Sequence, residues 1–205
     1  MTLESEDLLQ SILNSLDRID YIRTQDIPDI ELYMDQVTTF MGSRLKNSAR
    51  NPEDDKILTK TMINNYAKND LLPPPSKKKY SREHILLLIF IYYYKGILSI
   101  SDIQTILRPI TERYFHKKGD SFCLEDIYNE VFGLEKAEVE FLKKDVAEKF
   151  QKAQGTFSEA PEEDQAFLRT FSFLCMLSFD VYVKKLIIEK LIDSCGELFE
   201  SRKEK

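Results

Sequence analysis

The segment from Thr59 to Tyr80, TKTMINNYAKNDLLPPPSKKKY, constrains the fold more than any other part of the chain. Its first half has helical spacing, which places Met62, Ile63 and Tyr66 on one face. Three consecutive prolines must end that helix, because proline lacks an amide donor and disfavours a helical residue before it. Three lysines and a tyrosine follow at 77–80. The order is therefore a short helix, an abrupt stop and a basic turn.

The opposite face of this predicted helix is polar. A polar helix face beside a lysine-bearing loop is what a winged helix-turn-helix presents to a DNA groove and its phosphates. Asparagine can bond an adenine edge through two hydrogen bonds, and lysine can reach guanine or phosphate. We therefore expect base contacts from Lys60, Thr61, Asn64, Asn65 and Lys68, and phosphate contacts from Lys77, Lys78, Lys79 and Arg82.

The same segment resembles the recognition helix and wing of MerR-type regulators. Their pattern runs Ser/Thr, then Thr-Ile-Arg-Tyr-Tyr, then Gly-Leu-Leu-x-Pro-Pro, then a tyrosine before the next helix. A second match covers 96–107 (GILSISDIQTIL), with one residue inserted. The departures are Asn64 and Asn65 for Arg and Tyr, Ala67 for Glu, Asp70 for Gly, and a longer turn before the recognition helix. The matching residues are Thr59, Ile63, Tyr66, Leu71, Leu72, Pro74, Pro75, Tyr80, Ser81, Ser99, Ile103, Ile106 and Leu107.

The whole layout is more similar to a bacterial family described as domain of unknown function 1836, which carries a MerR-like helix-turn-helix. That resemblance implies DNA binding, but it names no operator, effector ligand or reaction. We expect a DNA-binding transcriptional regulator. We expect an all-α protein with one small winged insertion. Its predicted parts are an N-terminal amphipathic helix in 1–25, a MerR-like winged helix-turn-helix in 26–116, and a helical scaffold or dimerisation region in 117–205.

Charge is distributed unevenly along the chain. The net charge is −6, but the stretch 44–82 holds ten Lys/Arg against four Asp/Glu, a balance of +6. Residues 1–43 carry two basic and nine acidic residues. Polyanion binding depends on local neutralisation of phosphates and not on the charge of the whole chain. The lysines at 77–79 fit either a DNA-contacting wing or a solvated loop, and their place after the predicted helix favours the wing.

Composition predicts a cytoplasmic protein. The three cysteines, Cys123, Cys175 and Cys195, are widely spaced and odd in number, which is typical of reduced thiols. The chain does not open on a basic segment followed by an apolar run, so we expect no signal peptide. The longest apolar run, at 85–94, is too short to span a bilayer. Most of the chain can be helical, since it has only six glycines.

Helical patterns cover most of the remaining sequence. The run ILLLIFIYYY lies in a helix predicted at 82–97, which must sit inside a bundle because it is apolar on nearly all sides. Ser99 and Asp102 form a capping box that starts the next helix. A polar loop is expected at 46–57. Further helices are predicted at 5–23, 29–45, 100–116, 122–132, 135–152, 162–178 and 180–201, the last beginning at Asp180.

Catalysis has little support in the sequence. The only histidines, His84 and His116, are too few for a metal site, and no CxxC, HExxH or glycine-rich phosphate loop is present. Neither a metal nor another cofactor is expected. The tyrosines at 92–94 fit a bundle core better than a stacking site for a planar ligand. An enzyme on a helical bundle is a further functional class, and only the absence of glycine loops and metal ligands argues against it.

Two questions stay open at this point, one about assembly and one about function. The apolar residues of 167–199 fit either a helical hairpin that closes the monomer core or a homodimer interface. The second question is whether the protein binds DNA. A protein-interaction module could retain the winged shape without binding DNA, and Glu53, Asp54 and Asp55 favour it because carboxylates repel phosphates.

Overall fold

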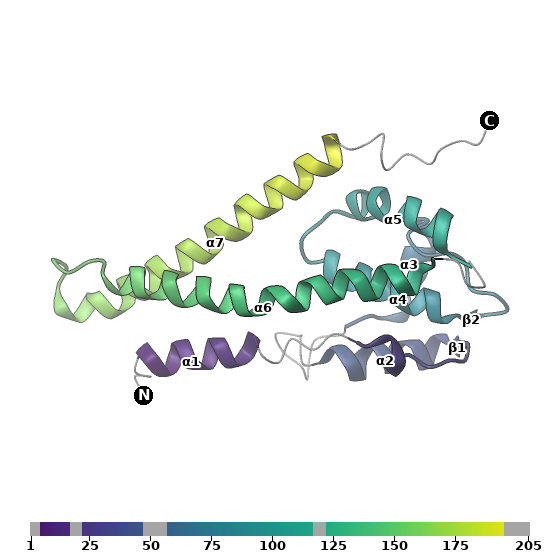
Figure 1. Cartoon of the computed structure of the whole chain (residues 1–205), viewed down its shortest axis with the longest axis horizontal. Helices are drawn as coiled ribbons and strands as arrows, with labels where there is room; N and C mark the ends of the chain where they lie inside the picture. Colours follow the sequence, from purple (N-terminus) through teal and green to yellow (C-terminus); the bar gives the residue numbers. More distant parts are fainter. Residues whose placement is uncertain (1–4, 17–21, 47–56, 117–121, 195–205) are drawn as a thin grey trace. The chain divides into compact units, whose positions relative to one another are not determined.

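The computed structural model describes residues 5–16, 22–46, 57–116 and 122–194. These residues form seven α-helices, one 3-10 turn and a two-stranded sheet (Figure 1), so the prediction of a mainly helical protein is confirmed. The chain divides into two compact units. Unit 1 comprises residues 1–20 and 133–187, and unit 2 comprises residues 21–132 and 188–205.

Unit 2 contains the segment that opened the sequence analysis. Its sheet joins β1 to β2 in antiparallel register, with Leu32 opposite Tyr80 and Tyr33 opposite Lys79. The strands therefore bring the residues before α2 together with the residues after the prolines. The elements in chain order are η1 (Thr24–Asp26), β1 (Leu32–Tyr33), α2 (Met34–Leu45), α3 (Lys60–Lys68), β2 (Lys79–Tyr80), α4 (Arg82–Tyr94) and α5 (Ile100–Tyr114).

The core of unit 2 is built around α4. Every residue from 84 to 91 is buried, as the all-apolar run predicted, and residues of α2, α3 and α5 pack against this helix. Tyr92, Tyr93 and Tyr94 are partly buried at the edge of the same core. The predicted capping box also forms, since Ser99 N donates to Asp102 Oδ2 at 3.1 Å and Asp102 N donates to Ser99 Oγ at 3.1 Å.

Unit 1 is made of α1 (Ser5–Leu16) and long stretches of α6 (Leu124–Gln154) and α7 (Glu162–Ser194). Its core is small: Phe150, Ala153 and Phe173 are its buried residues among those described, with Leu9 and Leu177 partly buried beside them. Lys149 of α6 pairs with Asp180 of α7 at 2.7 Å. A small apolar cluster and the Lys149–Asp180 ion pair therefore connect α6 and α7.

Several predicted helix ends are wrong. α6 runs through the break expected at 133–134. α7 runs through Ser178-Phe179-Asp180, so the two helices predicted at 162–178 and 180–201 are one helix as far as Ser194, where the described residues end. Asp180 lies inside α7, where it pairs with Lys149 instead of capping a new helix. A single glycine in a helix interior costs only about 1 kcal/mol relative to alanine, so Gly133 does not end α6.

The N-terminal predictions also need correction. The helix expected at 29–45 begins only at Met34, because Leu32 and Tyr33 form β1. The helix expected at 5–23 ends at Leu16 in the described residues, and Ile22 and Arg23 are not helical. Residues 47–56, with the carboxylates at 53–55, lie outside the described residues, as does Cys195. No helix in the described ranges has the length and apolar character needed to cross a bilayer.

Candidate nucleic-acid interface

α3 separates an apolar face from a polar one. Thr59 caps the helix, because its Oγ1 accepts a hydrogen bond from Met62 N at 3.1 Å. Ile63 and Tyr66 are buried, and Met62 is partly buried against the same core. The prediction of the inward face is therefore confirmed. The residues expected to contact bases all lie exposed on the other side of the helix: Lys60, Thr61, Asn64, Asn65 and Lys68.

The C-terminal end of α3 is closed by a left-handed residue. Asp70 has a φ of 53°, a conformation in which glycine is the usual residue and Asp is tolerated. Leu71 N then donates to Tyr66 O at 2.9 Å, and both side chains are buried. This is the hydrogen bond and apolar contact of a Schellman motif. Asp70 therefore takes a position at which glycine is the usual residue, and the turn still forms.

Two hydrogen bonds from other elements fix the position of α3. Before the helix, Lys95 Nζ at the end of α4 donates to Ile57 O at 2.7 Å. Burial lowers the pKa of Lys95. After the helix, Gln104 Nε2 of α5 donates to Asn69 O at 3.0 Å. The exposed polar face is therefore presented by a helix that is anchored at both ends.

A tight turn at Ser76–Lys79, the lysine turn, follows the prolines. Lys79 N donates to Ser76 O at 2.9 Å. The central residues Lys77 and Lys78 have φ values of 49° and 66°, the combination of a type I′ turn. Asn-Gly or Gly-Gly is the usual sequence there, because a side chain in the left-handed region is strained. Both lysine side chains are exposed.

Lys79 differs from the two lysines before it. It pairs with Tyr33 across the sheet, and its Nζ lies 5.5 Å from the centre of the Tyr33 ring. Its side chain is only partly exposed. An ammonium group over an aromatic ring is attracted by the ring's negative face. The ammonium group of Lys79 therefore lies over the Tyr33 ring, whereas the side chains of Lys77 and Lys78 are exposed on the turn.

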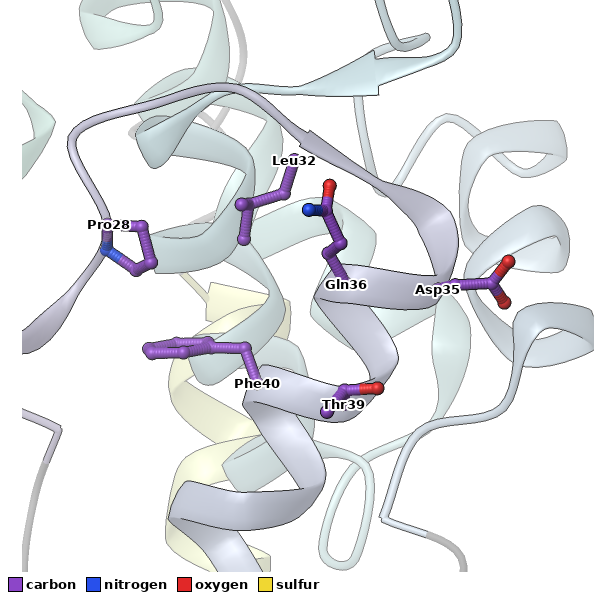
Figure 2. Close-up of a pocket in the computed structure, with 6 residues that line it drawn as sticks. All are labelled: Pro28, Leu32, Asp35, Gln36, Thr39 and Phe40. Carbon is purple, nitrogen blue, oxygen red and sulfur yellow. The ribbon is translucent and has the colours of Figure 1, made fainter.

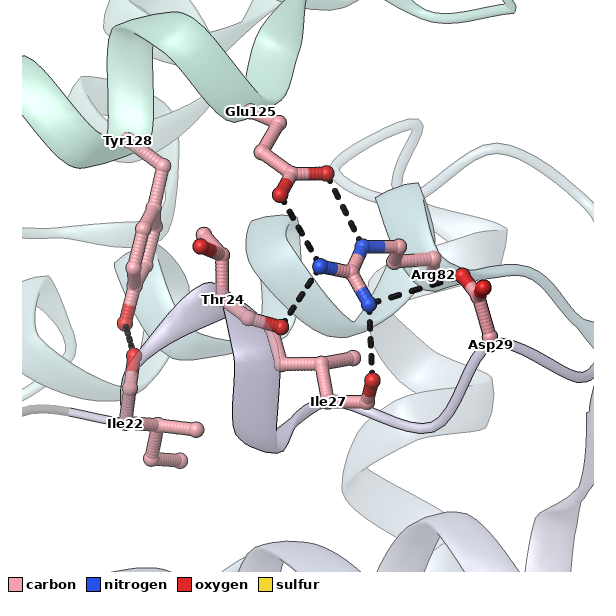
Figure 3. Close-up of polar contacts among 7 residues, drawn as sticks. All are labelled: Ile22, Thr24, Ile27, Asp29, Arg82, Glu125 and Tyr128. Carbon is pink, nitrogen blue, oxygen red and sulfur yellow. Dashed lines mark hydrogen bonds and ion pairs between the residues drawn. The ribbon is translucent and has the colours of Figure 1, made fainter.

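The Arg82 side chain is hydrogen-bonded to other residues of unit 2 (Figure 3). Its guanidinium makes two 2.9 Å hydrogen bonds to Glu125 of α6, and it donates to Ile27 O at 2.7 Å and to Thr24 O at 2.6 Å. The side-chain hydrogen bond with Glu125 is the main reason that the pKa of Arg82 is raised and that of Glu125 is lowered. These contacts favour a structural role for Arg82 over the expected phosphate contact. Its guanidinium donors are used to hold residues 24–27 against α4 and α6.

Sequence reasoning missed this network because its members are far apart in the chain. Tyr128 OH adds a 2.6 Å hydrogen bond to Ile22 O, which is drawn beside the Arg82 contacts in Figure 3. Asp29 Oδ1 lies 3.7 Å from Arg82 Nη1. An arginine next to a helix N-cap was a sign of local importance, but nothing in the sequence paired it with Glu125.

Lys60 is paired with a carboxylate. Its Nζ forms an ion pair with Asp35 of α2, and both side chains are exposed. Asp35 also borders a pocket of about 360 Å³ beside β1 and α2. Figure 2 shows Pro28, Leu32 and Phe40 gathered at one end of this pocket, while Asp35 points away from them. Gln36 and Thr39 complete the lining.

The geometry defines a helical domain in which an anchored, polar helix lies in the same unit as a basic turn. A family model described as Domain of unknown function (DUF1836) matches residues 22–131, more than half of the chain. The chain therefore belongs to this family. No curated protein and no solved structure matches the chain. Within the described ranges, no group of three or more His, Cys, Asp or Glu residues is placed to hold a metal ion.

Proposed function

We propose that residues 22–131 form a MerR-like winged helix-turn-helix that binds duplex DNA, and that the protein is a transcriptional regulator. In this proposal α2 and α3 are the two helices of the motif, and α3 is the recognition helix. The lysine turn is the wing. The support is the order of the elements: α3 ends abruptly, and the turn that follows is paired through β2 with the strand that precedes α2.

The strained lysine turn is the observation that carries the proposal. Left-handed backbone costs roughly 1–2 kcal/mol for a residue with a side chain. Glycine or asparagine would relieve the strain at Lys77 and Lys78, yet both positions hold long cations that project from the turn. Strained residues gather at functional sites, where the surrounding structure supports them. A phosphate backbone is the partner that two exposed ammonium groups at a wing tip would suit.

The recognition helix supplies the base contacts in this account. Asn64 and Asn65 lie next to each other on the exposed face, between Lys60 and Lys68. An asparagine amide can donate to and accept from one adenine edge at the same time, while lysine reaches guanine or phosphate. Thr61 adds a hydroxyl at the N-terminal end of the face. The set combines two amides with flanking cations, which is a suitable composition for a major-groove surface.

Binding to the promoter region upstream of the protein's own gene is the direct test. Fluorescence anisotropy with a labelled duplex from that region, and with a scrambled duplex of the same composition, would be recorded over a series of salt concentrations. We expect binding to both duplexes at low salt and tighter binding to the promoter. Absence of binding to either duplex at about 50 mM salt would contradict the proposal.

A protein-interaction module is the second candidate function. The observation that favours it is the pocket at Pro28, Leu32 and Phe40, which has apolar side chains at one end and lies beside β1. The Lys60–Asp35 pair also favours it, because the Asp35 carboxylate of α2 lies beside the first residue of α3 and repels phosphate. This candidate predicts that the scrambled and the promoter duplex are bound equally poorly at every salt concentration.

A further inference from the structure

The middle of α7 has an unusual distribution of charge. Residues 167–183, FLRTFSFLCMLSFDVYV, contain two charged side chains, Arg169 and Asp180. Arg169 Nε donates to Thr156 O at 3.2 Å, and its Nη2 donates to Gln165 Oε1 at 2.8 Å. Asp180 pairs with Lys149 of α6. Both charges are therefore used within unit 1, which leaves about five helical turns with no other ionic group.

The exposed side of this helix is rich in large apolar residues. Their exposed fractions lie between 51% and 68%, and many of them recur at spacings of three and four residues, which places them along one broad stripe. We call these residues the α7 stripe: Phe167, Phe171, Leu174, Phe179, Val181, Tyr182 and Leu186.

The α7 stripe contains more large apolar side chains than the buried core of unit 1 does among the described residues. Unit 1 buries Phe150, Ala153 and Phe173 among its described residues, whereas the seven large apolar side chains of the α7 stripe stay exposed. Monomeric proteins rarely expose one apolar patch above a few hundred Å². Helices this long gain most of their stability from packing an apolar face. Unit 1 therefore needs a second surface against the α7 stripe.

We propose that a second copy of this chain covers the α7 stripe. Four residues of the stripe are aromatic and would bury about 150–250 Å² each when fully covered, and the other three are smaller, so the half-exposed set offers roughly 800 Å² per copy. A stable interface needs about 800 Å² from each partner. A two-fold contact must also be complementary to itself. From Phe167 to Tyr182 the exposed apolar surface has no ionic group besides Arg169 and Asp180, which are paired within unit 1, so nothing there repels its own copy, and Lys185 follows at its C-terminal end.

Ser178 provides a sharp test of this interface. It is exposed, and its position four residues after Leu174 and three before Val181 puts it within the α7 stripe. A glutamate there would face its counterpart or an apolar surface in the dimer, and it would remain in water in a single copy. Ser101→Glu is the matched control, because Ser101 is an exposed helical serine in unit 2 and the change in charge is the same.

Sedimentation velocity and light scattering on the full-length protein, without DNA, provide the measurement. We expect a dimer at tens of micromolar for the wild type and for Ser101→Glu. Ser178→Glu should weaken association by at least about a hundredfold, because a buried charge without a partner is costly. Far-UV circular dichroism should show unchanged helix content. A wild-type monomer at every concentration, or a dimer equally stable with Ser178→Glu, would overturn the proposal. Neither result depends on DNA binding.

Discussion

Lys77 and Lys78 occupy the two central positions of one turn, and both have a positive φ. The turn lies next to β2, which pairs with β1 directly before α2. A strained backbone at this place therefore sets the direction of two ammonium groups relative to the helices of unit 2. The proposed wing and the proposed recognition helix belong to one packed body.

Replacing both lysines by glycine separates folding from function. Lys77→Gly/Lys78→Gly should raise the free energy of unfolding by about 1–2 kcal/mol, because glycine adopts a positive φ without steric cost and two strained positions are relieved. The same variant should bind DNA more weakly. Urea denaturation and anisotropy on one preparation measure both effects. Lower stability in the double variant would show that the lysine side chains support the fold.

Neighbouring residues on α3 should have opposite effects. Ile63→Ala should lower the stability of unit 2 by about 2–5 kcal/mol, because Ile63 is fully buried. Asn64→Ala should change stability by less than about 0.5 kcal/mol, because Asn64 is exposed. If Asn64 reads a base, its loss should reduce the preference for promoter over scrambled DNA by about 1–3 kcal/mol. Thermal melting and competition binding would record the two effects.

Removing the Lys60–Asp35 ion pair should increase the affinity of the protein for DNA. Asp35→Asn removes a carboxylate that competes with phosphate for Lys60 and repels DNA. We expect the variant to bind duplex DNA more tightly, with a larger difference at low salt because exposed charges are screened at high salt. Unchanged affinity at about 50 mM salt would mean that Lys60 lies away from the DNA.

Arg82 should behave as a structural residue. Arg82→Lys keeps the charge but loses the two-point contact with Glu125 and most of the bonds to Thr24 and Ile27. Hydrogen bonds to charged groups contribute about 1.5–3 kcal/mol each, so we expect a loss of about 2–4 kcal/mol in a chemical denaturation experiment. A phosphate-contacting arginine would instead tolerate lysine with nearly unchanged stability.

His84 gives unit 2 a dependence on pH. Its Nδ1 accepts a 2.9 Å hydrogen bond from Ser81 N, and the ring is buried. Burial lowers the pKa of His84 below its ordinary value, although the backbone of Pro73 and Pro74 acts in the opposite direction. The unfolded chain therefore takes up this proton more readily than the folded one. Stability should fall as the pH drops below about 6.5.

His84→Gln tests that dependence. Glutamine at this position can also accept from the Ser81 amide, as in an ordinary capping box, but it does not titrate. The variant should lose less stability between pH 7.5 and pH 5.5 than the wild type. Melting temperatures over this range would show it. Parallel pH profiles for the two proteins would assign the pH dependence to other groups.

Local signals in the sequence were sufficient for α3 and its surroundings. Thr59, the prolines and the alternation of buried and exposed residues act over a few positions, so the cap, the stop and the two faces of α3 could be predicted. The burial of α4 followed from its uninterrupted apolar run. Each of these features is decided by chemistry within one or two helical turns.

Long-range contacts decided what the sequence did not reveal. Asp180 has the chemistry of an N-cap, but its pairing with Lys149 lets α7 continue. Leu32 and Tyr33 have no strand pattern of their own, and they become β1 because Lys79 and Tyr80 lie opposite them. Arg82 appeared as one more cation in a basic stretch until its partner on α6 was placed. Partners distant in the sequence fixed all three outcomes.

The dependence of DNA affinity on salt tests the central claim most directly. Phosphate contacts release counterions, so four contacts from Lys60, Lys68, Lys77 and Lys78 should give a slope of log affinity against log salt of about −3 to −4. Lys77→Gly/Lys78→Gly should flatten the slope by about two units on promoter and scrambled duplexes alike. Lys136→Ala/Lys144→Ala removes the same charge from exposed positions on α6 and should leave the slope unchanged. An unaltered slope in the glycine variant, or no wild-type binding at low salt, would contradict the account.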